Sequence, residues 1–163
     1  MTIEDSLFQT VPLGTNQQSE CSPTDPGEPW RGALIRAPSQ VTLPAYRFPV
    51  PQMTLRLPLC VTFRLEASSL YAKGPLVVVA TDVQSGRIYR GEVVNPDPHP
   101  QAPRPQFAPI DPKLLRGLII SGYFNLNVAS HLPLPAMPAT YDILVEYGTV
   151  QSNQVRVTVL PPQ

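Results

Sequence analysis

Hydrophobic and polar residues alternate along two long segments of the chain, which is the pattern of β-strands with one buried face. In residues 57–65 every odd position is Leu, Val or Phe, while Cys60, Thr62 and Arg64 lie on the other side. Residues 118–128 repeat the pattern, with mainly apolar even positions. Each segment is therefore expected to turn one face of a strand towards a core.

Three further strands are predicted in the first half of the chain. The continuous apolar run at 76–80 is typical of a central strand that is covered on both faces. Short strands are expected at 34–37 and 40–43, separated by Pro38. The one helical element with a local signal is a single turn at 128–132, which Asn127 is placed to cap and Pro133 to end.

The last third of the chain predicts a hairpin between 141–147 and 153–160. The apolar residues of both segments face one core only if the connecting loop has three or five residues, with Gly148 supplying an unusual backbone angle. That register would pair Val145 with Val155 and Ile143 with Val157. The final segment is also a candidate edge strand, although Pro161 and Pro162 would oppose its extension.

A second hairpin is predicted around Ser85-Gly86. A two-residue loop there would pair Val83 with Ile88 and Val78 with Val93.

Proline changes this picture, because 22 of the 163 residues are proline and long helices have little room. Residues 96–112 hold seven of them, so this segment is interpreted as a long proline-rich inter-strand loop. It contains Pro100 and Pro103 in a P-x-x-P match followed by Arg104. The match suggests a docking peptide for a partner protein, and a stiff linker is the alternative.

Residues 1–32 show no sustained period and are interpreted as a flexible acidic N-terminal arm ahead of a domain at 33–163. The arm has a net charge of −4, and the rest of the chain therefore carries +4, since the whole chain is neutral. A solvated tail is favoured, and an arm that lies on the body is the alternative. The arm residues at which docking could begin are Leu7, Phe8, Val11, Leu13 and Trp30.

Cys21 and Cys60 are the only cysteines. Free thiols are the simpler interpretation, and a bridge that pins the arm is the alternative, because spacing alone does not decide between them. The N-terminal residues carry no classical export signal, and no apolar stretch reaches the roughly 20 residues of a membrane-spanning helix. The compartment is unknown, and a cytoplasmic location is taken as the default.

About seven short strands without a long helix favour two packed antiparallel sheets, with a closed barrel as the alternative. Residues 138–145 with 152–157 resemble the last hairpin of immunoglobulin-like and fibronectin type III-like domains. The resemblance implies an all-β, antiparallel immunoglobulin-like β-sandwich in which the hydroxyl of Tyr141 donates to the backbone at the preceding corner. The inward cysteine pair and core tryptophan of antibody domains are missing, since Cys60 lies on the outward side and Trp30 precedes the sandwich.

Composition and motifs disfavour several functional classes. A neutral chain has no positive field to attract nucleic acid or an anionic membrane. Phosphate-binding glycine loops and zinc motifs do not occur, so no metal and no cofactor is expected. Ser130 and His131 suggest a nucleophile and a base, but adjacent residues seldom point at each other, and His99 has only scattered acids nearby. The chain is therefore not expected to be an enzyme.

Two binding functions remain as hypotheses. The first is a non-catalytic protein-interaction or structural module that contacts protein partners, including copies of itself, through the arm with Trp30, the proline-rich loop or an edge strand. The second is a carbohydrate-binding module, since Tyr123, Asn125 and Asn127 project from one side of a strand and offer an aromatic ring beside two amides. An ordinary polar strand face is the alternative to such a sugar platform.

Overall fold

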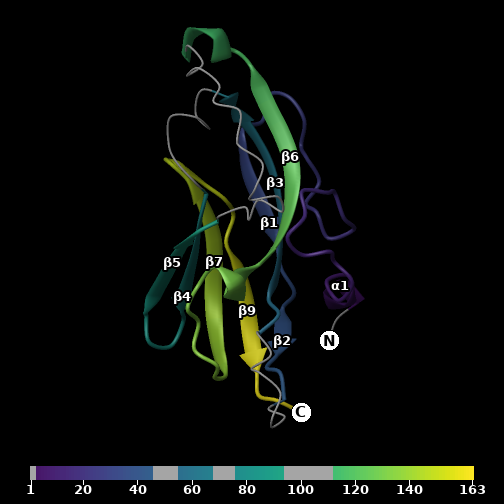
Figure 1. Ribbon diagram of the computed structural model, residues 1–163, viewed down its shortest axis with the longest axis vertical. Coiled ribbons are helices and arrows are strands. Elements are labelled where there is room, and N and C mark those ends of the chain that lie inside the picture. The colour runs from purple at the N-terminus through teal and green to yellow at the C-terminus, as the bar shows by residue number, and fades with distance from the viewer. Residues whose placement is uncertain (1–2, 46–54, 68–75, 94–111) are drawn as a thin grey trace, which may run out of the picture.

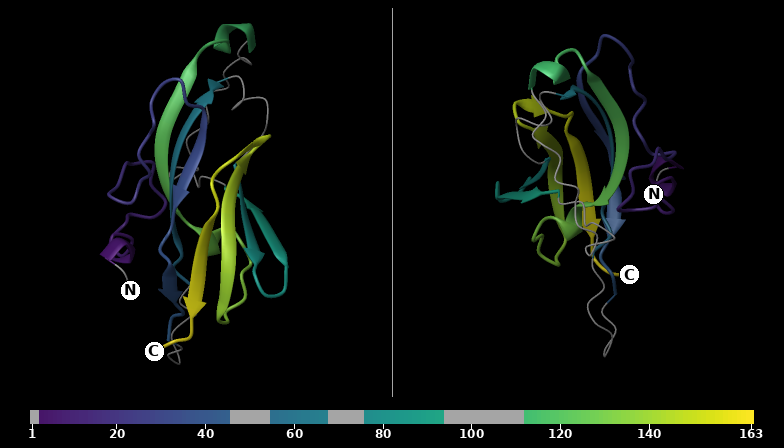
Figure 2. Two further views of the ribbon diagram at one scale, coloured as in Figure 1. Left: turned by 180° about the vertical axis from the view of Figure 1, so that it is seen from behind. Right: turned by 45° about the horizontal axis from the view of Figure 1, so that its top comes forward.

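The structure is a computed structural model that describes residues 3–45, 55–67, 76–93 and 112–163. The described chain is mostly β and forms two sheets that pack face to face (Figures 1 and 2). Its helical elements are short: α1 (Ile3–Ser6) and the 3-10 turns η1 (Pro112–Leu115) and η2 (Val128–Ser130). Within the described ranges, no helix has the length and apolar character needed to span a membrane.

The smaller sheet contains three antiparallel strands in the order β1-β3-β6. Its strands are β1 (Gly32–Arg36), β3 (Pro58–Glu66) and β6 (Ile119–Asn127). β3 and β6 correspond to the two segments predicted from alternation, and β1 overlaps the short strand that was expected at 34–37. The capped turn is also confirmed, because the Asn127 side chain accepts a hydrogen bond from the backbone N–H of Ala129 at the start of η2.

The larger sheet has the order β2-β9-β7-β4-β5, with β8 paired to β7. Its strands are β2 (Gln40–Thr42), β4 (Val77–Asp82), β5 (Ile88–Glu92), β7 (Ala139–Tyr147), β8 (Val150–Gln151) and β9 (Val155–Leu160). The predicted central position of β4 is confirmed. The prediction of an edge strand at 153–160 is wrong, because β2 adds in parallel to β9 and leaves that strand between two neighbours.

The core lies between the two sheets and is filled mainly by side chains from alternate strand positions. Ile35, Val61 and Leu126 contribute from the smaller sheet. Val145 and Val157 contribute from the larger sheet and are 1% and 0% exposed. Alternation therefore identified most of the inward residues on both sheets, but Leu118, which it placed on the inward face, is 53% exposed.

The C-terminal hairpin has a different register from the predicted one. A two-residue loop joins Tyr147 to Val150, and Gly148 takes a φ of +59° there. Ile143 then pairs with Val155 instead of Val157, because one extra residue bulges between β8 and β9. The bulge places the valines of β9 on the inward face, which is the outcome that an odd loop was expected to produce.

The other hairpin is also displaced by two residues from its predicted register. Thr81 pairs with Ile88 and Val78 with Gly91, and the Asp82 N–H donates to the Arg87 carbonyl, so four residues, Val83 to Gly86, lie beyond the last hydrogen bond between the strands. Hydrogen bonds from the backbone of Gln84 and Ser85 to the Asp82 carboxylate stabilise this longer loop.

Tyr141 is buried in the core at 1% exposure and meets the edge of the Tyr89 ring. Its hydroxyl has no hydrogen-bond partner among the described residues. The hydrogen bond that the resemblance implied is therefore missing from the described part of the chain, and burial raises the pKa of this phenol.

Candidate functional site

Residues 3–31, called the arm below, cross the outer face of the smaller sheet, the face turned away from the core (Figure 1). The expectation of a solvated tail is wrong for these residues. Five groups of contacts hold the arm to strand residues or to the chain beside them. They involve Cys60, Asn125, Arg64 with Thr62, Arg56, and Ser39.

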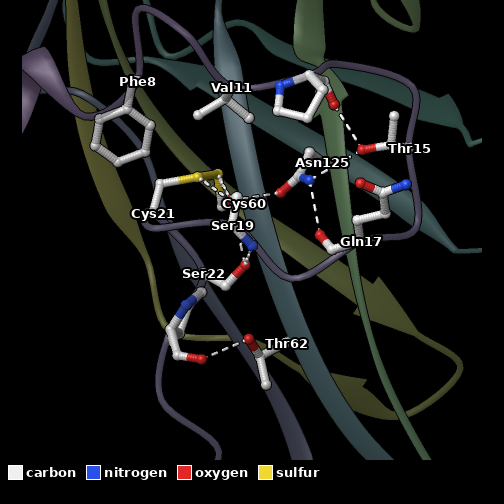
Figure 3. The surroundings of a disulfide bond; sticks show 12 residues. Phe8, Val11, Thr15, Gln17, Ser19, Cys21, Ser22, Cys60, Thr62 and Asn125 are labelled. Atoms are coloured by element: carbon white, nitrogen blue, oxygen red, sulfur yellow. Dashed lines mark hydrogen bonds between the residues drawn. A yellow bond between two sulfur atoms is a disulfide. The ribbon is translucent and has the colours of Figure 1, made fainter.

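A disulfide between Cys21 and Cys60 is the covalent link between arm and sheet, with a Cα–Cα distance of 6.0 Å. Both cysteines are completely buried, so the interpretation as free thiols is wrong. Phe8 and Val11 of the arm cover the disulfide (Figure 3). Both residues are among the positions at which the sequence predicts that docking begins.

Asn125 of β6 fixes the next part of the arm (Figure 3). Its side-chain Nδ2 donates to the Gln17 carbonyl at 2.9 Å and to Thr15 Oγ1 at 3.1 Å, and its Oδ1 accepts from the Ser19 hydroxyl at 3.3 Å. Its backbone N–H donates to the Thr15 carbonyl at 2.9 Å, and its carbonyl accepts from Gly14 N–H at 2.8 Å. The arm thus forms a short antiparallel bridge with β6.

Charge complementarity holds the end of the arm that leads into β1. Arg64 of β3 contacts Asp25 at 2.9 Å and Glu28 at 3.0 Å, and Thr62 donates to the Pro23 carbonyl at 2.6 Å. The hydrogen bond from Arg64, helped by the Gly27 N–H, lowers the pKa of Asp25. The pKa of Glu28 is also lowered, chiefly by a hydrogen bond from Arg31.

Two contacts attach the start of the arm. The guanidinium of Arg56 donates to the carbonyl oxygens of Phe8 and Val11 at 2.7 and 3.0 Å. The buried carboxylate of Asp5 accepts from the backbone N–H and the hydroxyl of Ser39. The arm is therefore attached along its whole described length.

The structure separates the three residues of the expected sugar platform. Tyr123 is half-buried, whereas Asn125 is 1% exposed beneath the arm. The amide of Asn127 is bonded to Leu57 N–H and the Leu55 carbonyl as well as capping η2. Both amides therefore hold the fold together.

The remaining candidate interaction residues do not form a common site among the described residues. Trp30 is half-buried, and its indole lies over Gly32 at the start of β1. Pro100, Pro103 and Arg104 lie outside the described residues, as does His99.

Ser130 and His131 end η2, and no acidic side chain is bonded to either of them within the described ranges. Burial lowers the pKa of His131, against a hydrogen bond to the backbone of Glu92 that raises it. In the part of the chain that the structure describes, no group of three metal-ligating side chains occurs.

The open edge of β6 is the feature of the site that sequence analysis missed. Since the N–H and carbonyl of Asn125 point away from β3 towards the arm, the backbone groups of Ile119, Ser121 and Tyr123 point in the same direction. They have no partner among the described residues. The segment Ile119–Tyr123 is called the β6 window below.

The opposite edge of the same sheet is blocked at Ile35. The side-chain amide of Asn153, which lies between β8 and β9, accepts from Ile35 N–H at 2.8 Å and donates to the Ile35 carbonyl at 3.1 Å. It replaces the peptide group of a further strand next to β1. The smaller sheet thus has one edge that is blocked at Ile35 and one edge that is open along Ile119–Tyr123.

Comparison of the chain with known protein families, with curated proteins and with solved structures finds no match.

Proposed function

We propose that this chain is a non-catalytic protein-interaction module, an immunoglobulin-like β-sandwich that binds a protein partner by adding a strand to the β6 window. The observation that carries the proposal is the row of unpaired backbone groups at Ile119, Ser121 and Tyr123. Such a row is a template for another strand, and proteins usually guard it with charged residues or proline. The nine residues of β6 include neither.

The arm supports this proposal because it leaves the edge as the accessible part of the smaller sheet. It covers Cys60 and Asn125 on the outer face, and its bridge ends at Thr15 opposite Asn125. The immunoglobulin-like assignment is supported by the two-sheet architecture and by the resemblance of the C-terminal hairpin. The carbohydrate alternative is not carried forward, since both amides on which it depended are bonded within the chain.

The disulfide supports a proposal about the compartment. A structural disulfide persists in an oxidising environment and is uncommon where glutathione and thioredoxin keep thiols reduced. We therefore propose that the protein functions in an oxidising compartment, in place of the cytoplasmic default.

The proposal is tested by affinity capture with matched variants of the whole chain. The bait proteins are the unaltered chain, Ser121→Lys in the β6 window and Ser130→Lys on η2, where the serine is also exposed. A partner of the window is retained by the unaltered chain and by Ser130→Lys and is lost with Ser121→Lys. The candidate is then purified and its binding to the same three chains is measured by calorimetry. The proposal fails if Ser121→Lys changes neither the captured proteins nor the self-association of the purified chain.

A further inference from the structure

We infer that the strand received by the β6 window is the β6 window of a second copy of this chain, paired antiparallel about a twofold axis at Ser121. The inference rests on the proposed function and names its partner. Four observations lead to it: the limits of the window, its register, its lack of charge and an exposed leucine beside it.

The window has a boundary at each end. At one end the arm already occupies the edge, because Thr15 is bonded to Asn125. At the other end the strand direction changes at Gly117, which has a φ of +76°. Between these limits the residues with outward backbone groups are Ile119, Ser121 and Tyr123.

These three positions are symmetric about Ser121, which is the condition for self-pairing across a twofold axis. In the antiparallel arrangement Ser121 faces Ser121 of the second copy, and Ile119 faces Tyr123 of the second copy. Each facing pair exchanges two backbone hydrogen bonds. The arm does not obstruct this register, because the residue that would face Asn125 is Gly117, where the strand has already ended.

The composition of the window suits pairing with itself. Self-pairing about a twofold axis places each side chain beside a residue of the same segment, so like charges would meet at close range and oppose it. The sequence of β6, IISGYFNLN, contains no charged residue. The pair of Ile119 with Tyr123 joins a β-branched side chain to an aromatic ring, a favourable combination across strands.

Leu118, immediately before β6, gives an independent reason for a partner. It is 53% exposed although it continues the pairing with β3, where its carbonyl accepts from Ala67 N–H. In the proposed register Leu118 lies beside Phe124 of the second copy. Pairing would therefore cover an apolar side chain that the single chain leaves in water.

The test is sedimentation equilibrium of the purified chain over a range of concentrations at low ionic strength. We expect the average mass to rise with concentration from 17.9 kDa towards about twice that value. Ser121→Glu and Ser121→Lys each place like charges on the axis, and each chain is expected to stay monomeric. An equimolar mixture of the two variants places opposite charges there and is expected to recover the dimer.

Ser130→Glu and Ser130→Lys are the matched controls, and neither they nor their mixture is expected to change the mass distribution. Circular dichroism checks that all four variants keep the fold. The inference is overturned if the unaltered chain is monomeric at every concentration, if the single Ser121 variants dimerise like the unaltered chain, or if their mixture stays monomeric. A monomeric chain that still captures another protein through Ser121 would refute self-pairing and leave the proposed function standing.

Discussion

The outer faces of the two sheets follow the same alternation but have different surroundings. On the larger sheet, Arg156 pairs with Asp142 on the neighbouring strand, and 62% of the arginine side chain remains exposed. On the smaller sheet, Arg64 contacts two acids of the arm and is 19% exposed. An outward polar residue is therefore a surface group only where no other segment of the chain offers it complementary partners.

The largest loss of stability is expected when the disulfide, which only the smaller sheet has on its outer face, is removed. Replacing both Cys21 and Cys60 by alanine is expected to lower the free energy of unfolding by about 4 kcal/mol, because the bridge closes a long loop in the unfolded chain. Urea unfolding with and without reductant measures the loss. The double variant should be insensitive to reductant. Equal stability of the oxidised and reduced unaltered chain would contradict the assigned role of the bridge.

The next largest loss of stability is expected from the buried amide of Asn125, which is hydrogen-bonded to the arm. Asn125→Ala is expected to cost about 2 kcal/mol, since it removes the hydrogen bonds that the buried amide makes with Thr15, Gln17 and Ser19 of the arm. Thr140→Ala on the larger sheet removes only a hydroxyl shared with Thr158 and should stay within about 0.5 kcal/mol. Urea unfolding of both variants makes the comparison. If both variants lost the same free energy of unfolding, the contacts of Asn125 with the arm would contribute nothing to stability.

A matched pair of arginine variants tests whether ion pairs hold the arm on the smaller sheet. Arg64→Gln removes the contacts to Asp25 and Glu28, and faster hydrogen exchange is expected for the amides of residues 22–31. Arg156→Gln removes one surface pair and should leave those amides unchanged. Hydrogen exchange followed by mass spectrometry reads both. Unchanged exchange in the arm of Arg64→Gln would show that the ion pairs do not hold it.

The smallest effect should be seen in the titration of single carboxyl groups. The pKa of Asp25 lies below its ordinary value of 3.8, so its pairing with Arg64 stabilises the fold above that pH and is lost as the pH falls through the lowered pKa. In Arg64→Gln the pKa of Asp25 should rise. The pKa of Glu28 should stay low, because Arg31 is its main cause, and that of Asp142 should stay low because of Arg156. Carboxyl NMR titration of both chains checks all three.

Local patterns predicted most of the strands and their inward faces. Alternation placed Val61 and Val145 in the core, and the cap at Asn127 followed from a short-range rule. Strand registers were less accessible, because the bulge between β8 and β9 depends on Ser152, which bonds to both the N–H and the carbonyl of Val145. Nothing local to that hairpin distinguishes a bulge from a longer loop.

The largest error concerns the arm, which the sequence predicts as a solvated tail. This error has a physical cause. The contacts of the arm join residues far apart in the chain, as from Gln17 to Asn125, and such pairs leave no periodic trace. One signal did exist: an arm of charge −4 beside a body of +4 fits the contacts of Asp25 and Glu28 with Arg64. The polar row at Cys60, Thr62 and Arg64 was compatible with water or with a covering segment.

The amide of Asn153 has a consequence for the size of any assembly. It occupies both outward groups of Ile35, so an added strand cannot form a continuous ladder of hydrogen bonds beside β1. A sheet that accepts neighbours at both edges can grow without limit into a fibre, whereas a sheet with one accepting edge stops growing when that edge is filled. Loss of the Asn153 side chain would therefore expose a second edge at which strands can pair. The chain would then form open-ended aggregates instead of stopping at a dimer.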